Sequence, residues 1–250
     1  MFSKETKLFL VLAGFFITNA LVAELIGGKI FSFEQTIGIE SFSFSLLGQE
    51  GLSLNLTAGI LLWPVVFIVT DIINEYFGMR GVRFLSFLTV GLIAFAFLST
   101  FGAIHLAPAD FWPKAYTSKG VPDMQKAFAA VFGQGNRIMI GSMIAFAIGQ
   151  ILDAWVFQKI KKKTGEGKLW LRATGSTFIS QFIDSFVVLG IAFYGIMSIP
   201  QIIAIGLVGY LYKFCAAFVI TPLIYFAHKI IDKYLGHENA SRLKEEAMQN

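Results

Sequence analysis

Long apolar stretches alternate with short polar segments along the whole chain. A helix that crosses a bilayer needs about 20 apolar residues, because each residue advances about 1.5 Å through roughly 30 Å of hydrocarbon. The pattern therefore predicts an all-α polytopic membrane protein with a single transmembrane domain over residues 1–250. We expect six transmembrane helices, over residues 8–27, 56–77, 84–107, 138–157, 173–196 and 202–227. The first stretch is too long for a cleavable signal peptide.

Two connecting segments are long enough to have structure of their own. Residues 28–55 contain the alternating run SFSFS, which is compatible with a short hairpin, a re-entrant stretch or a packed loop. Residues 108–137 carry three prolines and mixed charge, which favours an interfacial or partly helical loop. The third segment, residues 158–172, is a basic loop that contains KKKTGEGK.

The positive residues divide unevenly between the two sides of the expected membrane. Fourteen Lys and Arg residues fall on the side of the termini and the basic loop, and five fall on the side of the two long loops. Because positive residues favour the cytoplasm, we expect both termini to be cytoplasmic and residues 28–55 and 108–137 to be outer loops.

Composition narrows the function classes. The chain is 56% hydrophobic and 14% charged, whereas soluble domains carry about 25% charged residues, which excludes an ordinary cytosolic enzyme and a nucleic-acid binder. A single cysteine excludes an intramolecular disulfide framework. No HExxH, GxSxG, P-loop or Cys/His cluster occurs, so we expect no metal, no cofactor and no enzyme activity.

Acidic residues interrupt the second span in TDIINEYFG. Asp71 and Glu75 lie one helical turn apart on one face, where two carboxylates in a poor dielectric do not ionise easily together. A charge at the bilayer centre costs at least about 2.5–3.5 kcal/mol, so such residues usually face a cavity or a partner. The alternative is that Glu75 lies at the cytoplasmic interface.

The fourth and fifth spans repeat one polar pattern, in GQILDAWVF and SQFIDSFVV. Gln150 precedes Asp153 by three residues, and Gln181 precedes Asp184 by three, so each pair shares a helix face. A single polar side chain often only stabilises the contact between two helices. Two matching pairs on adjacent spans favour a binding site.

Lys213 lies in the middle of the sixth span, about 20 Å from its outer end. Asp71 and Asp153 lie at a similar depth, so we expect Lys213 to be the counter-ion of one of them, although a purely structural ion pair is the alternative. Asn19 of the first span lies nearer the midplane with Asp184. Together these residues predict a layered polar cavity.

Two further features shape the predicted cavity. Gly141, Ala145 and Gly149 are spaced by four residues, which permits close helix approach, and Pro64 is expected to kink the second span. Carboxylates and Gln amides bind the edge of a heterocycle with adjacent N–H donors, much as they bind base edges. The cavity therefore suits a polar, planar small molecule.

Two blocks of this sequence are similar to a known family. NLTAGILLWPVVFIVTDIINEYFG resembles the second-span signature of the queuosine precursor transporters, within the vitamin uptake transporters. GQILDAWVF followed by KLWLRATGSTFISQFIDSFVVLGIAFYG resembles their second signature. By motif match the family's polar positions fall on Pro64, Asp71, Glu75, Gly78, Asp153, Trp170, Arg172, Ser176, Gln181 and Asp184.

The resemblance implies a six-span importer in the bacterial inner membrane. Its expected cargoes are 7-cyano-7-deazaguanine and 7-aminomethyl-7-deazaguanine, 7-deazaguanine bases salvaged for tRNA modification. We take the substrate-binding candidates to be Asn19, Asp71, Glu75, Gln150, Asp153, Gln181, Asp184 and Lys213. The partners expected are a small-molecule substrate and the lipid bilayer, and not nucleic acid. A homo-oligomer and an energy-coupling subunit both stay open, as does the energy source.

Other function classes compete with this interpretation. The wider group also includes substrate-binding subunits of energy-coupling-factor transporters, which often carry Ala-x-x-x-Ala in the first span. Ala13, Ala20 and Ala23 lack that spacing, which favours a solitary carrier. An intramembrane enzyme would need a nucleophile and a base at one depth, and a channel would need a continuous water-filled pore.

Overall fold

The computed structural model describes residues 2–133 and 136–249, so residues 134 and 135 of the expected outer loop 108–137 lie outside the described residues. Five helices in this part of the chain are long and apolar enough to cross a membrane. They are α1 (Lys4–Ile26), α3 (Trp63–His105), α5 (Asn136–Thr164), α6 (Leu169–Phe193) and α7 (Ile199–Leu235). The predicted all-α polytopic class is confirmed.

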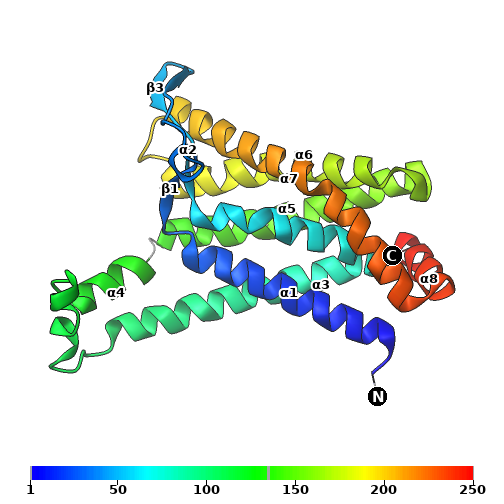
Figure 1. Ribbon diagram of the computed structural model, residues 1–250, viewed down its shortest axis with the longest axis horizontal. Helices are drawn as coiled ribbons and strands as arrows, with labels where there is room; N and C mark the ends of the chain where they lie inside the picture. Colours follow the sequence, from blue (N-terminus) through cyan, green and yellow to red (C-terminus); the bar gives the residue numbers. More distant parts are fainter. Residues whose placement is uncertain (1, 134–135, 250) are drawn as a thin grey trace.

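Helix α3 contains both the second and the third expected spans. Its 43 residues would measure about 65 Å if straight, twice the hydrocarbon thickness. At Gly78 the backbone takes φ 67° and ψ −174°, which is not helical, and the chain reverses there into two arms (Figure 1). The arm after Gly78 has 27 residues, and the arm before it reaches 20 residues when it is counted from the start of the 3₁₀ turn Ala58–Leu61, so the fold is compatible with six crossings.

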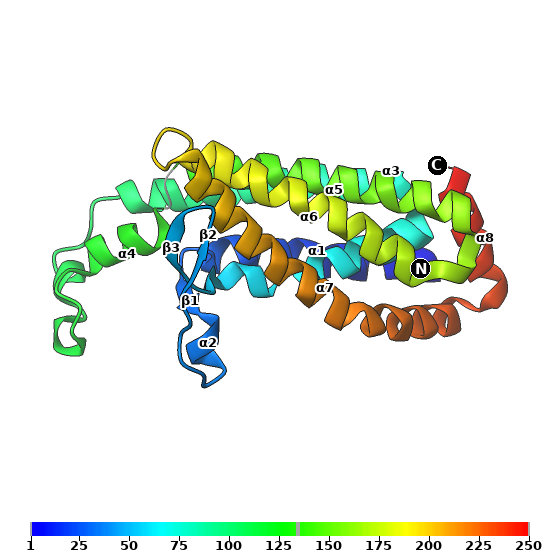
Figure 2. The ribbon, with the colours of Figure 1, turned by 90° about the horizontal axis from the view of Figure 1, so that it is seen from above.

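The two ends of the bundle differ in character. We call one end the basic end: it holds the start of α1, the Gly78 turn, the α5–α6 turn and the C-terminal helix α8 (His237–Gln249) (Figure 2). The opposite end, the loop end, holds the strands, α4 (Met124–Phe132) and the α6–α7 turn. Both termini therefore lie together, and which end faces the cytoplasm stays a prediction.

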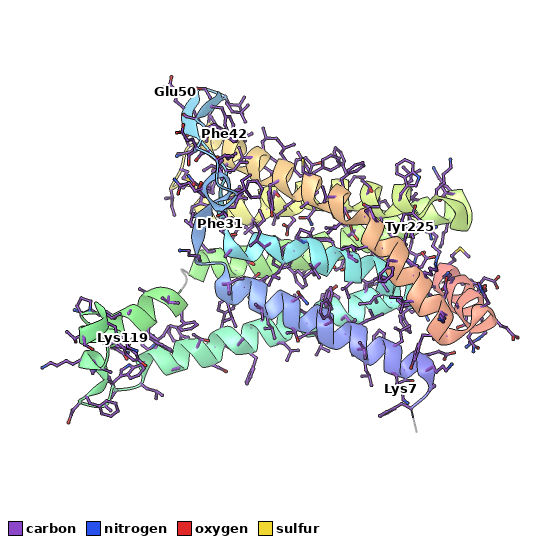
Figure 3. The ribbon with its side chains drawn as sticks, in the orientation of Figure 1. Lys7, Phe31, Phe42, Glu50, Lys119 and Tyr225 are labelled. Atoms are coloured by element: carbon purple, nitrogen blue, oxygen red, sulfur yellow. The ribbon has the colours of Figure 1, made fainter. Side chains whose placement is uncertain are left out.

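The SFSFS region forms strands, in agreement with the hairpin alternative. β2 (Phe44–Leu46) pairs antiparallel with β3 (Gln49–Leu52), and β1 (Ile30–Ser32) pairs with β4 (Asn55–Thr57) (Figure 3). Between β1 and β2 lies the short helix α2 (Phe33–Thr36). The Leu54 backbone N–H donates to buried Glu34 at 2.8 Å, which lowers the pKa of that carboxyl.

The other connecting segments are more helical than expected. The second outer loop contains α4 and the short 3₁₀ turns Trp112–Lys114 and Thr117–Lys119, and another such turn, Ala58–Leu61, leads into α3. The expected basic loop 158–172 is mostly helix, because α5 continues to Thr164 and α6 begins at Leu169 after the 3₁₀ turn Gly165–Lys168. Lysines are good helix formers and complement the dipole in a last turn.

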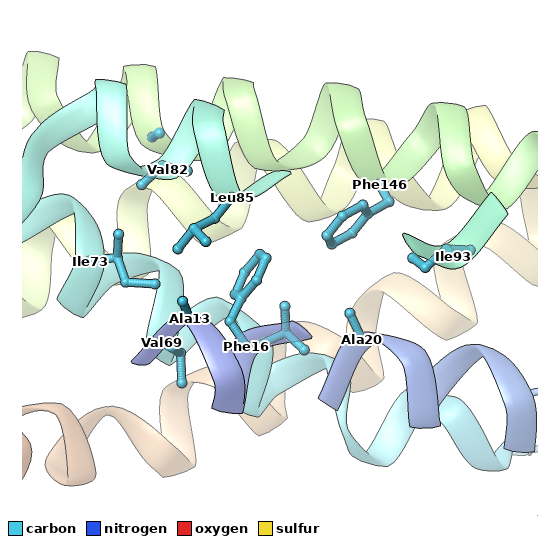
Figure 4. Close-up of a cluster of buried hydrophobic side chains, with 11 residues drawn as sticks. Ala13, Phe16, Ala20, Val69, Ile73, Val82, Leu85, Ile93 and Phe146 are labelled. Carbon is cyan, nitrogen blue, oxygen red and sulfur yellow. The ribbon is translucent and has the colours of Figure 1, made fainter. Parts of the chain in front are cut away.

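An apolar cluster joins α1, both arms of α3, and α5 (Figure 4). Phe16 of α1 lies between the arms of α3, and Phe146 of α5 packs beside it with ring centroids 6.0 Å apart. Lipid tails are as apolar as these side chains, so close van der Waals packing rather than water exclusion stabilises the contact. The cluster fixes α3 against α5, which positions the polar residues beside it.

Small residues bring α5 and α6 close together, as expected. A Cβ added to Gly141 would lie 3.2 Å from the Ile191 Cβ, and one on Gly149 would lie 3.5 Å from the Asp184 Cβ. The expected kink at Pro64 is wrong, because Pro64 lies in the first turn of α3, where its missing N–H costs no hydrogen bond. The break in α3 occurs at Gly78 instead.

Helix α7 is most deeply buried near its two ends. Its buried residues are Ile202, Ala204 and Gly206 toward the loop end, and Ile224, His228, Ile231 and Leu235 toward the basic end. None of residues 207–223 is buried, and Pro222 lies inside the helix there. The middle of α7 contacts α6 through partly exposed side chains, among them Tyr210 and Lys213.

Candidate functional site

The polar residues of the spans form layers between α3, α5, α6 and α7. At the layer nearest the basic end, Glu75 of α3 is bound by two cations. The Arg172 guanidinium lies 2.8 Å from one carboxylate oxygen of Glu75, and the Lys161 ammonium lies 3.2 Å from the other. All three side chains are at most 2% exposed. Glu75 is therefore part of a buried ion cluster near the basic end, and its partners are Lys161 and Arg172.

Lys161 of α5 also connects α3 and α8 in this layer. Its ammonium donates to the Glu75 carbonyl at 3.0 Å and to the Lys244 carbonyl of α8 at 3.4 Å. Nearby, the Tyr76 hydroxyl donates to Asp232 at 2.7 Å, and Lys244 binds the other oxygen of Asp232 at 3.0 Å. This network closes the basic end across α3, α5, α7 and α8.

One turn further into the bundle, Asp71 of α3 meets Asp153 of α5. The two carboxyls are within hydrogen-bonding reach of each other, and both are at most 1% exposed. The Ser180 hydroxyl of α6 donates to Asp153 at 2.8 Å, and buried Ser176 lies beside the same carboxyl. The repeated acidic positions of the two spans therefore converge.

Amide side chains pair on either side of these carboxyls. Gln150 accepts from the Thr70 hydroxyl at 2.6 Å. Asn74 donates to the Ala154 carbonyl at 3.0 Å and accepts from Gln158 at 2.8 Å. These contacts fix the register of α3 against α5 over about two turns of α5.

Lys213 pairs with Asp184, and the expected pairing with Asp71 or Asp153 is wrong. The Lys213 ammonium lies 2.6 Å from the Asp184 carboxylate, with side-chain exposures of 12% and 18%. The depth that was counted along the helix axis from the sequence gives the position of the Lys213 Cα and not that of its ammonium group. Side chains tilt toward a helix N-terminus, which for α7 is the loop end, so the long Lys stem carries its charge back to Asp184.

Glu24 near the end of α1 also belongs to this outer layer. It is 7% exposed, accepts a short hydrogen bond from Ser142 of α5, and interacts electrostatically with Asp184. The sequence reasoning missed Glu24 because it lies three residues before GG, where a solvated helix end was expected. The sequence did contain one signal for the burial of Glu24, because it lies on the same helix face as Ala20 and Ala23, which are buried.

Several buried polar atoms near these layers lack a hydrogen-bond partner among the described residues. They include one oxygen each of Asp71 and Asp153, the Gln150 amide nitrogen, and both polar atoms of Gln181. Gln181 is 2% exposed. Leaving such atoms unpaired is costly, so they are the candidate contacts for water or a ligand.

A narrow cleft between α3, α6 and α7 reaches Asp71. Pro64 and Phe67 line it on α3, Thr177 on α6, and Ala217 and Thr221 on α7. About 10 Å³ of it is open to the centre of a water molecule, which is room for about one water. Small-molecule sites measure roughly 300–1,000 Å³, so the cleft in this conformation is too small for a planar base.

Two expected site features lie elsewhere. The Asn19 amide donates to the Phe15 carbonyl of its own helix at 2.8 Å, so this hydrogen bond does not join α1 to the polar layers. Trp170 is half exposed and its backbone N–H donates to Tyr225 of α7, whereas Arg172 is buried on Glu75. Anchoring therefore suits Trp170, and closing the basic end suits Arg172. Among the described residues, no group of three His, Cys, Asp or Glu could hold a metal ion.

Comparison with known proteins identifies the family. Residues 57–227 match the family described as "putative vitamin uptake transporter". The chain is 31% identical over 186 residues to a "probable queuosine precursor transporter" of Bacillus subtilis (strain 168), which covers 73% of this chain and 76% of that relative. It is 29% identical over 167 residues to a protein of the same description from Haemophilus influenzae, covering 64% of this chain and 63% of that relative. No solved structure matches the chain.

The family match includes α3 and its carboxyls, the Gln-x-x-Asp pairs of α5 and α6, and most of α7. The residues that build the buried layers therefore lie within the matched region, apart from Glu24 and the end of α7 with α8. With five long apolar helices and bacterial transporter relatives, the chain is a multi-pass bacterial membrane protein, and it belongs to the vitamin uptake transporter family, in the group that includes the queuosine precursor transporters.

Proposed function

We propose that this protein imports queuosine precursors across the bacterial inner membrane. The cargoes are 7-cyano-7-deazaguanine and 7-aminomethyl-7-deazaguanine, which the cell salvages into tRNA modification. The names of the two relatives support the cargo class. The basic end faces the cytoplasm, in keeping with the distribution of Lys and Arg residues.

The observation that carries this proposal is the set of unpaired amide atoms inside the bundle. Gln150 offers a free N–H, and Gln181 offers both a donor and an acceptor, in an interior otherwise closed to water. A guanine-like edge presents complementary donors and acceptors side by side. The amides bind the edge of the base, and Asp184 with Lys213 supplies a polar wall toward the loop end.

The transport cycle is an alternation of access between the two ends. The ion cluster at Glu75 closes the basic end, and the middle of α7, in which no residue is buried, is the wall that moves to admit cargo. Ala13, Ala20 and Ala23 of α1 are buried within the chain itself, so they do not form an exposed docking face for a coupling subunit. This supports a solitary carrier.

The test is uptake-dependent tRNA modification. The chain is expressed in cells that neither make queuosine precursors nor carry their own importer, each 7-deazaguanine is supplied at nanomolar concentration, and queuosine in tRNA is measured. We expect restored modification, lost with Gln181→Leu and kept with Gln35→Leu, an exposed glutamine of the loop end. No restoration by a wild-type chain that is present in the membrane would refute the proposed cargo.

A further inference from the structure

The carboxyls of Asp71 and Asp153 form a pair that transport of the neutral cargo, 7-cyano-7-deazaguanine, does not require. They come from different helices, are within hydrogen-bonding reach, and are at most 1% exposed. One oxygen of each has no hydrogen-bond donor among the described residues. The hydroxyl of Ser180 at 2.8 Å and the neighbouring Ser176 complete an oxygen-rich enclosure.

The fixed cations nearby are engaged elsewhere. Arg172 of α6, 2.8 Å from Glu75, acts on Asp71 only through space, and Lys161 of α5 binds the same Glu75 carboxylate. On α7, Lys213 is bound to Asp184. Glu75 lies one turn from Asp71 and adds negative charge from the same helix. The charged groups that face the Asp71–Asp153 pair from α3, α5 and α6 therefore do not supply the positive charge that would neutralise it.

Two bare carboxylates in contact inside a bundle repel each other and have lost their hydration, so a cation between them is required for both to stay buried. Carboxylate and hydroxyl oxygens are ligands for hard cations. The cleft that ends at Asp71 has room for about one water, which suits a small ion and excludes a base.

We propose that Asp71 and Asp153 form the binding site of a monovalent cation, a proton or Na⁺, whose inward movement is coupled to cargo import. This rests on the proposed function and supplies its energy source. The site joins α3 to α5 one turn from the ion cluster at Glu75. Without the cation the two helices repel each other there, so the cation changes the stability of the closed basic end, which is the physical basis of coupling.

The test uses purified full-length protein in proteoliposomes with labelled 7-cyano-7-deazaguanine, a neutral probe, at clamped membrane potential. One arm has equal pH and Na⁺ on both sides and measures exchange of labelled for unlabelled probe. The second arm has a tenfold inward proton gradient, and the third a tenfold inward Na⁺ gradient. For one-to-one coupling we expect about tenfold accumulation in one gradient arm, which also identifies the ion.

The outcomes separate the two proposals. Exchange without accumulation in either gradient arm would refute the coupling site and leave the cargo intact. Absence of exchange for the wild-type protein would refute the cargo, and the coupling with it.

Variants then assign the site. Asp71→Asn and Asp153→Asn keep shape and hydrogen bonding but remove the charge, so we expect exchange to persist while gradient-driven accumulation falls to about onefold. Glu40→Gln, at an exposed carboxylate of the loop end, is the matched control. Loss of exchange together with accumulation would assign the carboxyls to the cargo and overturn the cation site. If either variant folds poorly, thermal unfolding of the wild-type protein gives an independent readout, because the coupling ion must raise the midpoint temperature as its concentration rises.

Discussion

The buried ion cluster at Glu75 makes the sharpest prediction about stability. Glu75→Gln removes the single carboxylate that Lys161 and Arg172 share, and leaves two cations that are at most 2% exposed. Removing one partner of a buried pair costs about 3–5 kcal/mol, because the remaining charge is uncompensated. At about 2–4 °C per kcal/mol for a chain of this size, the midpoint of thermal unfolding should fall by roughly 6–20 °C.

Thermal unfolding of the detergent-solubilised protein measures this shift. Lys162→Met removes an exposed charge next to the cluster and should leave the midpoint within about 1–2 °C, as surface changes do. Replacing Glu75, Lys161 and Arg172 together by Met should recover most of the loss, since an apolar replacement of a whole buried cluster is often neutral. A Glu75→Gln midpoint equal to that of Lys162→Met would refute the reasoning.

Three further perturbations test other parts of the structure. Gly78→Ala should lower the amount of folded protein in the membrane, because Ala at φ 67° is strained and its Cβ would lie 2.9 Å from the Ala247 carbonyl oxygen; wild-type yield on membrane blots would contradict this. Lys213→Met should impair uptake more than the double variant with Asp184→Asn, because the single change leaves a carboxylate unpaired; a double variant no better than the single would remove the pairing from the mechanism. The folded-state pKa of Glu34 is lowered, so its stabilisation of the loop end is complete at neutral pH and is lost as the pH falls through that pKa. Amide hydrogen exchange near β1 should therefore speed up in acid for the wild-type protein, and Glu34→Gln should abolish that dependence.

Periodicity and composition predicted the elements of this fold well. Each expected span has a helix over it, since about 20 apolar residues allow few other structures in a bilayer. The shared faces of the Gln-x-x-Asp pairs follow from helical geometry, and the contact of Asp153 with Ser180 agrees with them. The reversal between the second and third spans was predicted to lie at residues 78–83, but its confinement to one non-helical residue, Gly78, was not predicted.

Pairings between helices were harder to predict. The partner of Lys213 depends on where a long side chain ends, and counting along one helix axis gives only where it starts. Lys161 belongs to a run of lysines that is indistinguishable from a solvated helix end, yet it is fully buried because α3 and α8 cover it. Such facts depend on contacts between residues 29 to 86 positions apart, and one sequence does not contain them.

The Gly78 reversal has a consequence for how the chain enters the membrane during synthesis. The two arms of α3 have no connecting loop, so one arm cannot be inserted into the membrane while the other remains in water. We expect the arms to enter together as one helical hairpin, with Arg80 and Arg83 holding the reversal on the cytoplasmic surface. A glycine with a left-handed backbone thereby sets the order of insertion, because everything from α5 onward depends on that hairpin having closed.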